Sequence, residues 1–337
     1  MLRYNTLAGP TSTFNGDNEP RSIRTLAGKA EAGYALPHAF RLTGGIGYEE
    51  KKRNTSPVRI VSFRETTEEI SYRAELRRMM SETVTGALAY VHSDRDGSPW
   101  TQTTVNNGTT GSNLIAPIHL ADRTRDKVRL TVNWAPIEPL TLNFYVDEAR
   151  DDYDARDGST VGPMEGTARS YSLDVGYAFT QDWQATAWYS RNETKAEQTT
   201  CSGASATGVC GSPTWGANLR NLSDNFGLGL RGKPTGTFEI GADVSYSDIK
   251  DEYKQETLIG APVTSLPNVS TKLTRLNLFG KYMLQKNAGV RLDYIYDRYK
   301  TDDWTWSNWM YADGTRITQD PDQTVNFVGV TYFLRWQ

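Results

Sequence analysis

The two cysteines are the residues of this chain whose spacing most clearly predicts a chemical bond. Eight residues separate Cys201 from Cys210 in a stretch rich in Ser, Gly, Ala and Thr. The pair predicts a disulfide formed in an oxidising compartment, because a metal site would need further ligands nearby. No Cys-x-x-Cys-His sequence occurs, so we expect no covalently attached c-type haem and no directly bound cofactor.

Histidines and clustered carboxylates could support two other kinds of chemistry. His92 and His119 flank one polar stretch together with Asp94 and Asp96, an arrangement conceivable for a surface hydrolase. No spacing marks a nucleophile, so solvated loop residues are the simpler interpretation. The acidic stretch 151–158 is similar to a calcium loop, because hard cations bind clustered oxygens, but it lacks the EF-hand spacing and the distal Glu. We therefore expect neither catalytic nor metal-binding residues.

The elements that carry these residues are defined by a regular alternation of apolar and polar positions. Tyr171, Leu173, Val175, Tyr177 and Phe179 share one face of an extended strand, and small or polar residues share the other. Similar repeats of about ten residues recur along the chain, longer than the five or six typical of soluble sheets. A closed barrel of such strands satisfies every backbone hydrogen bond in lipid. The sequence therefore predicts an all-β fold, a transmembrane antiparallel up-and-down β-barrel in a bacterial outer membrane.

The composition fits such a barrel and argues against two other classes of protein. The chain has 337 residues, 37% of them hydrophobic, a mean hydropathy of −0.59, and no apolar run long enough for a membrane helix. Its 18 Tyr and 9 Trp suit the aromatic belts at the two membrane interfaces. A net charge of −3 gives no basic surface for nucleic acid, which is not expected as a partner.

Long and short connections alternate between the expected strands, and this alternation predicts the topology. Tight turns fall near 35–38, 80–82, 135–139, 180–182, 233–236 and 285–288, and long polar stretches fall near 50–66, 93–121, 150–167, 195–220, 250–270 and 300–321. Such barrels keep short turns in the periplasm and long loops outside. We expect about 14 strands, counting a partial one at residues 3–5. One domain spans 1–337, with a periplasmic C-terminus and, in the absence of a signal peptide, an N-terminal truncation.

The polar faces of the expected strands carry charges of both signs. In the last hairpin, we expect Leu292, Tyr294, Val328 and Val330 to face lipid. The lumen-facing candidates for partner contact are Arg73, Glu75, Arg77, Arg129, Asp174, Glu239, Asp243, Arg275, Lys281, Arg291 and Asp293. The simpler interpretation of these residues is a solvated lumen wall whose charges pair across strands. The more specific interpretation is a surface that holds a protein plug. Neither sign dominates, as it would in a charge-selective pore.

The last fifty residues resemble a known family. The run from Val290 through Trp304, Trp306 and Trp309 is followed by Asp313-Gly-Thr, Gln319-Asp-Pro-Asp-Gln and a terminal Val330-Thr-Tyr-Phe-Leu-Arg-Trp-Gln. This tail is similar to the C-terminal end of the MtrB/PioB family of decahaem-associated outer-membrane β-barrel proteins. The upstream hairpins resemble that family more loosely.

The resemblance implies a function in extracellular electron transfer, such as metal reduction or iron oxidation. Members of the family form a porin-like sheath around a periplasm-facing multihaem c-type cytochrome, which carries the haem and exchanges electrons with an outer-surface cytochrome, metal oxides or iron(II). The surface aromatic cluster Trp304, Trp306, Trp309 and Tyr311 would anchor the barrel at the interface or contact an outer-surface cytochrome.

Two departures from the family pattern bear on this expectation. About 14 strands are roughly half the family's number and enclose little room for a cytochrome, and the family's N-terminal Cys-containing segment has no counterpart. We therefore expect the C-terminal half of a larger barrel rather than a reduced one. A general diffusion porin without a cytochrome partner is the alternative function.

Overall fold

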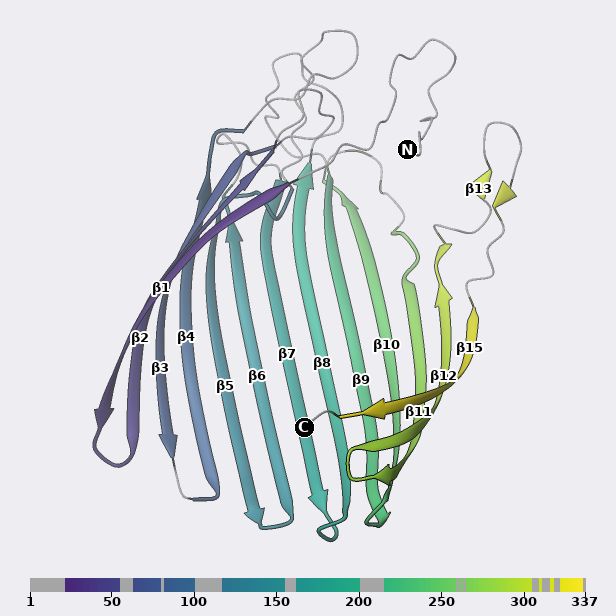
Figure 1. The fold of residues 1–337 in the computed structure, drawn as a ribbon. Helices are drawn as coiled ribbons and strands as arrows, with labels where there is room; N and C mark the ends of the chain where they lie inside the picture. Colours follow the sequence, from purple (N-terminus) through teal and green to yellow (C-terminus); the bar gives the residue numbers. More distant parts are fainter. Residues whose placement is uncertain are drawn as a thin grey trace.

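A single antiparallel sheet of thirteen strands in chain order dominates the computed structural model (Figure 1). The structure describes residues 22–54, 63–79, 82–100, 117–154, 162–200, 215–258, 260, 262, 265–304, 309–310, 316–317 and 322–335. The strands are β1 (Ile23–Leu36), β2 (Phe40–Arg53), β3 (Thr66–Met79), β4 (Val84–Gly97), β5 (Arg123–Ile137), β6 (Leu140–Tyr153), β7 (Gly162–Ala178), β8 (Trp183–Thr200), β9 (Trp215–Thr235), β10 (Phe238–Thr257), β11 (Val269–Gln285), β12 (Ala288–Asp302) and β15 (Gln323–Leu334). A small hairpin, β13 (Trp309–Met310) with β14 (Arg316–Ile317), lies in a stretch that the sequence analysis treats as a loop.

The all-β, up-and-down architecture predicted from the alternation is confirmed. The strand ends joined by tight turns lie at one end of the sheet, and the strand ends that precede and follow the longer connections lie at the other (Figure 1). The strand expected at residues 3–5 lies outside the described residues. Among the described residues, no helix has the length and apolarity needed to cross a membrane.

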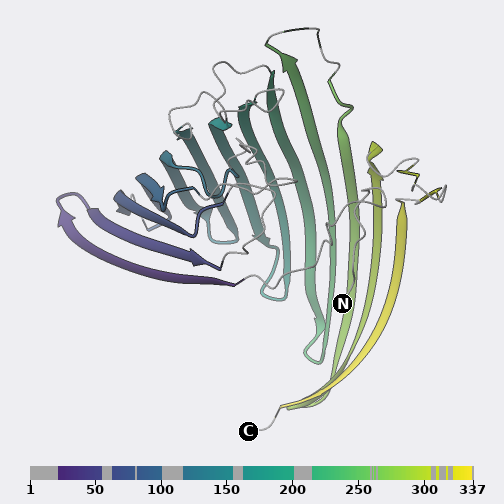
Figure 2. The same cartoon turned by 90° about the horizontal axis from the view of Figure 1, so that it is seen from above.

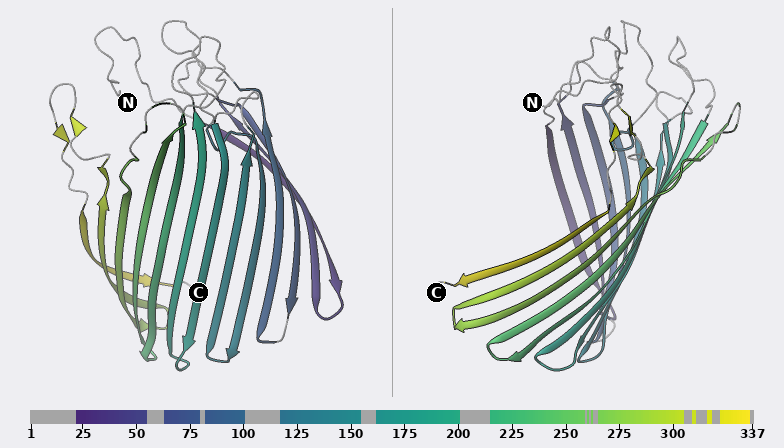
Figure 3. Two further views of the ribbon diagram at one scale, coloured as in Figure 1. Left: turned by 180° about the vertical axis from the view of Figure 1, so that it is seen from behind. Right: turned by 90° about the vertical axis from the view of Figure 1, so that its right-hand side faces the viewer.

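Seen from above, the strands follow an open arc with β1 and β15 at its two ends (Figure 2). Figure 3 shows the twist of this arc from behind and from the side. Each of these edge strands pairs with one neighbour among the described strands. Because successive hairpins reverse direction and the number of strands is odd, β1 and β15 run the same way, toward the tight turns. They cannot pair with each other in the antiparallel manner of the rest of the sheet.

The apolar face of the sheet carries two belts of aromatic residues separated by aliphatic and small ones. On β10, Phe238 belongs to the belt near the tight turns and Tyr246 to the belt near the long connections. These two positions lie about 27 Å apart along the strand, close to the apolar band of roughly 25 Å in outer-membrane barrels. Large apolar side chains between the belts are open to the surroundings, as Val330 is at 72% exposure. This face therefore contacts lipid.

The strands continue well past the aromatic belt near the long connections, which we call the outer belt. They are longer than the alternation of hydrophobicity predicts. The sequence pattern places the start of one strand near Phe226, whereas β9 begins at Trp215, and β10 runs to Thr257 instead of ending near residue 250. Beyond the belt both faces are polar, so the alternation of hydrophobicity disappears although the hydrogen-bonded ladder continues. Ion pairs across strands, such as Arg220 with Glu193 at 3.0 Å, link these extensions.

The tight turn between β1 and β2 holds two non-glycine residues in the left-handed region. His38 has φ 60° and Ala39 has φ 61°, and the Phe40 amide donates to the Pro37 carbonyl over 3.4 Å. Leu36 pairs with Phe40, so the connection consists of residues 37–39. Its two consecutive positive φ angles are typical of a type I′ turn, which favours Asn-Gly. Any residue with a Cβ at this second position is strained.

Replacing Ala39 with glycine should therefore stabilise the fold. We expect Ala39→Gly to raise the free energy of unfolding by about 1 kcal/mol, measured by urea titration in phospholipid vesicles. The matched control is Ala35→Gly, in the neighbouring strand, which should lose about 0.5–1 kcal/mol. Equal losses at both positions would contradict the turn assignment.

Candidate functional site

The polar face of the sheet is its inner, concave face. Here side chains two strands apart meet, as Arg123 on β5 does with Glu69 on β3 at 2.9 Å. An inward-curving surface, as in the arc of Figure 2, brings such side chains together. Side chains on this face are also more buried than those on the apolar face, and Asp147 is only 7% exposed.

The strand registers place every predicted lumen residue on this inner face. Arg73, Glu75 and Arg77 lie on β3, Arg129 on β5, Asp174 on β7, Glu239 and Asp243 on β10, Arg275 and Lys281 on β11, and Arg291 and Asp293 on β12. Leu292, Tyr294, Val328 and Val330 share the opposite face, as expected. The role of the inner residues in partner contact stays a prediction.

The inner face of β3 to β6 carries carboxylates that each bind two cations. Glu75 pairs with Arg73 and, at 3.3 Å, with Arg77. Asp147 accepts from Lys127 at 2.9 Å and Arg129 at 2.7 Å. The Tyr145 hydroxyl also donates to Asp147, over 2.6 Å.

Charge pairs on the inner face of β9 to β12 follow a simpler, one-to-one pattern. Arg275 makes a bidentate contact with Asp297, at 2.7 and 2.8 Å. Arg291 pairs with Asp293 at 2.7 Å and stacks over the Phe279 ring at 4.3 Å. The looser pairs are Lys281 with Glu239 at 3.6 Å and Arg231 with Asp243 at 3.8 Å.

The two signs of charge are therefore segregated around the arc, although they are mixed when counted along the chain. On the inner face of β2 to β5, Lys and Arg predominate over Glu49, Glu69 and Glu75; the cations are Arg41, Lys51, Arg53, Arg73, Arg77, Arg95, Arg123, Arg125, Lys127 and Arg129. On β6 to β12 the acidic residues predominate: Asp147, Asp151, Asp174, Glu239, Asp243, Asp251, Asp293 and Asp297.

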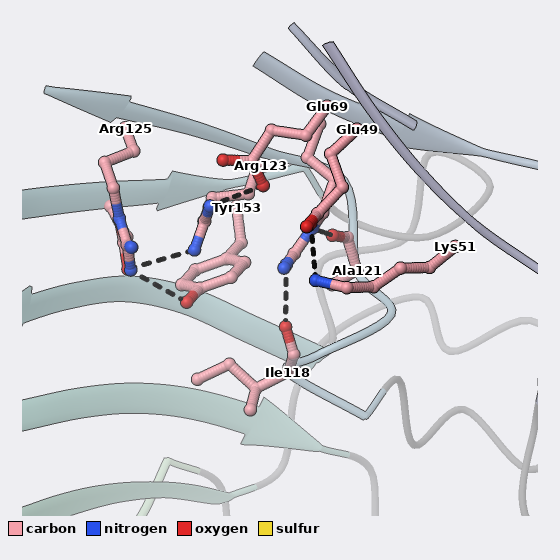
Figure 4. A network of polar contacts seen from close by, with 10 residues as sticks. Glu49, Lys51, Glu69, Ile118, Ala121, Arg123, Arg125 and Tyr153 are labelled. Atoms are coloured by element: carbon pink, nitrogen blue, oxygen red, sulfur yellow. Dashed lines mark hydrogen bonds and ion pairs between the residues drawn. The ribbon is translucent and has the colours of Figure 1, made fainter. Parts of the chain in front are cut away.

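An arginine network at the outer end of the inner face was not anticipated from the sequence (Figure 4). Arg95 donates to the carbonyls of Ile118, over 2.8 Å, and Ala121, over 3.0 Å. Arg64, which is 6% exposed, donates to the Leu120 carbonyl over 3.2 Å and pairs with Asp122. These contacts fix the segment 117–122 against the inner face. The only sequence signal was arginine beside a polar connection, and that pattern does not specify carbonyl partners.

The described part of the acidic stretch considered as a calcium loop, residues 151–154, begins on β6, where the strand alternation separates its carboxylates. Asp151 lies on the inner face, where Arg125 donates to it over 2.7 Å and Tyr153 over 3.2 Å, whereas Asp152 points to the other face. Burial raises the pKa of the Tyr153 phenol, so the hydroxyl stays a neutral donor. Within the described ranges, no group of three or more His, Cys, Asp or Glu is placed to hold a metal ion.

The histidines considered for a hydrolase do not come together. His92 lies on the outer face, 2.9 Å from Asp126 and 3.3 Å from Asp94. His119 lines a pocket on the inner face with Glu49 and Arg95. The two imidazoles therefore belong to opposite sides of the sheet.

The remaining predicted site residues are only partly described. The Trp304 indole donates to the Pro267 carbonyl over 2.9 Å, and Trp309 lies in β13. Trp306, Tyr311, Cys201 and Cys210 lie outside the described residues. The disulfide, which would tie the β8–β9 connection, stays a prediction.

A lipid-facing apolar band, two aromatic belts and a polar concave face place this chain in the class of outer-membrane β-barrel proteins. The family model for the outer membrane beta-barrel porin MtrB/PioB matches residues 4–336, so the chain belongs to the MtrB/PioB family. The resemblance of the tail to that family is thereby confirmed.

The chain is also similar to a curated relative and to solved structures. Outer membrane protein MtrB of Shewanella baltica (strain OS185) is 27% identical over 289 residues, which cover 85% of this chain and 39% of that protein. The chain thus spans about two fifths of the length of this curated relative. Among solved structures, the open form of the ferric-catecholate import receptor Fiu from E. coli K12 is similar, with a TM-score of 0.51 at 12% identity over 87% of this chain and 57% of the receptor. The unliganded ferric citrate transporter FecA has a TM-score of 0.49 at 11% identity, over 96% and 54%.

Proposed function

We propose that this protein is an outer-membrane sheath that embeds a multihaem c-type cytochrome and so permits electron transfer across the membrane. The observation that carries the proposal is the family match over residues 4–336. The polar inner wall described below also suits a protein occupant. The two cysteines of the chain do not form a haem-attachment motif. The electrons would therefore travel on the haems of the partner. That cytochrome would exchange them with an outer-surface cytochrome, metal oxides or iron(II).

The inner wall combines polarity with a smooth surface. The Phe279 ring lies against Gly241 on the neighbouring strand, where an added Cβ would approach the ring to 2.1 Å. Glycine at 241 therefore lets this ring lie flat on the wall instead of projecting into the lumen. A flat, hydrogen-bonding wall can contact a folded protein and keep it apart from lipid.

An antiparallel closure of the barrel would need strands beyond the thirteen of this sheet. Unpaired edge groups of β1 and β15 would each cost several kcal/mol in lipid. Since the two edges run the same way, an antiparallel closure needs an odd number of added strands. We propose that further strands of a larger barrel meet both edges, which would also widen the lumen for a cytochrome.

The proposal predicts that the barrel conducts electrons only with its cytochrome. Full-length protein is reconstituted in liposomes that contain a reduced viologen dye, with an impermeant iron(III) complex outside. We expect dye oxidation with the barrel and a multihaem cytochrome together, and none with either alone. Oxidation by the barrel alone, without leakage of the acceptor, would refute the sheath function.

A general diffusion porin is the second candidate, favoured by the segment 117–122 on the inner face. Leu120 and Ala121 are each 1% exposed, so the segment is packed as an inward-folded loop of a porin would be. Its arginine partners lie near the outer strand ends, however, so it lines the mouth rather than the middle of the lumen. Conductance of the purified protein that is unchanged by added cytochrome would favour the porin.

A further inference from the structure

The inner face of β4 forms the floor of a groove between two rows of cations. The floor side chains are small: Ala87, Ala89, Val91 and Ser93, with Ala89 at 5% and Ser93 at 3% exposure. The walls are Arg73 and Arg77 on β3 and Arg125, Lys127 and Arg129 on β5. We call this surface the β4 groove. Its floor extends roughly 20 Å along the strand.

The cations of the β4 groove exceed the carboxylates that bind them. Glu75 serves both Arg73 and Arg77, and Asp147 serves both Lys127 and Arg129. One positive charge therefore stays uncompensated at each carboxylate. On β11 and β12, by contrast, Arg275 has Asp297 to itself.

The exposure of the side chains shows which charge meets the lumen. The carboxylates lie beneath, with Glu75 at 13% and Asp147 at 10% side-chain exposure. The cations lie above them, at 59% for Arg77 and 40% for Arg129. The buried carboxylates therefore fix the cations in place and leave their free donors directed inward.

A hollow lies between the two rows of cations. Arg73, Ala89, Val91, Lys127 and Arg129 line a pocket of about 190 Å³. Small floor residues leave this space open, so a carboxylate from another molecule can enter between the rows. Charge-assisted hydrogen bonds from arginine and lysine would then hold it.

We propose that the β4 groove is the docking surface for an acidic surface of the cytochrome in the lumen. This inference rests on the proposed sheath function and adds to it the side of the barrel and the sign of charge that orient the partner. Complementary charge steers association and fixes the register of two surfaces. The groove suits a protein surface because its cations are pre-ordered in two rows. The cations on β5 repeat about every 7 Å, and Arg73 and Arg77 on β3 lie roughly 13 Å apart along the strand.

The test fills the groove with carboxylates and leaves its ion pairs intact. Val91 lies in register between Arg73 and Lys127, and Ala87 lies opposite Arg77. The variant Val91→Glu with Ala87→Glu neutralises the excess charge, and Val91→Gln with Ala87→Gln adds nearly the same volume without charge. Neither removes an existing partner, and an unchanged β-sheet circular dichroism spectrum verifies folding of each variant.

The first measurement is the ratio of haem to barrel in tagged full-length protein purified from its own membranes at about 150 mM salt. We expect the Glu variant to lose about tenfold, and the Gln variant to stay within about twofold of wild type. Carbodiimide treatment of the wild-type complex should also join Lys127 Nζ to a carboxylate of the haem-bearing chain, identified by mass spectrometry. Binding by the Glu variant equal to wild type, or equal losses with Glu and Gln, would overturn the groove as an electrostatic docking surface.

Two further outcomes separate this inference from its alternatives. Wild-type protein that purifies without haem would overturn the sheath function and the inference together, whereas haem retained by wild type and by the Glu variant overturns the inference alone. Reversal potentials of the cytochrome-free barrel in planar bilayers test a role in passage of free anions. A shift caused by the Glu variant, with cytochrome binding unchanged, would assign the groove to free anions and reject docking.

Discussion

An arginine in place of Leu278 should destabilise the folded barrel by about 2–4 kcal/mol, the cost of a cation on the lipid face near the bilayer midplane. Leu278 lies on the apolar face of β11, in register with Ala242, midway between the aromatic belts at Phe238 and Tyr246. The guanidinium would have no partner there and would be forced out of water. Urea titration of the full-length protein in phospholipid vesicles measures the change.

The matched control differs by one position along the strand. Asn277 lies on the inner face, in register with Asp243, so Asn277→Arg places the same charge beside a carboxylate. We expect a change within about 0.5 kcal/mol, as for most exposed substitutions. A similar cost at both positions would mean that the two faces are not lipid and lumen.

Replacing Asp147 with asparagine should cost about 2–3 kcal/mol of stability. This carboxylate is 7% exposed and accepts from Lys127, Arg129 and Tyr145. Its loss leaves two neighbouring cations to repel each other. Breaking a buried ion pair costs about 3–5 kcal/mol, and the partial exposure of both cations reduces that figure. The same urea titration reports the change.

Asp297 provides the comparison for this variant. Its contact with Arg275 is bidentate, but the pair is more exposed and involves a single cation. Asp297→Asn should therefore cost about 1 kcal/mol or less. If it cost as much as Asp147→Asn, the shared carboxylate would have no special part in ordering the inner face.

The membrane-spanning part of the strands was predictable because lipid imposes a two-residue period on it. Val328 and Val330 must face hydrocarbon and their neighbours must not, so the pattern fixes both the face and the register. Past the outer belt this constraint ends, which is why the extensions of β9 and β10 were missed. The strands continue there on hydrogen bonds and ion pairs, whose partners lie on other strands and leave no local signal.

The sequence by itself determined the all-β class, the direction of the hairpins and the identity of the inner residues, since each follows from alternation and turn composition along the chain. Only the tertiary structure decided which charges meet. Register brought Lys127 and Arg129 to one carboxylate and left small residues between two rows of cations. Curvature brought Arg95 to the carbonyls of the segment 117–122. Pairing of this kind depends on distances between strands, and a linear pattern holds no information about them.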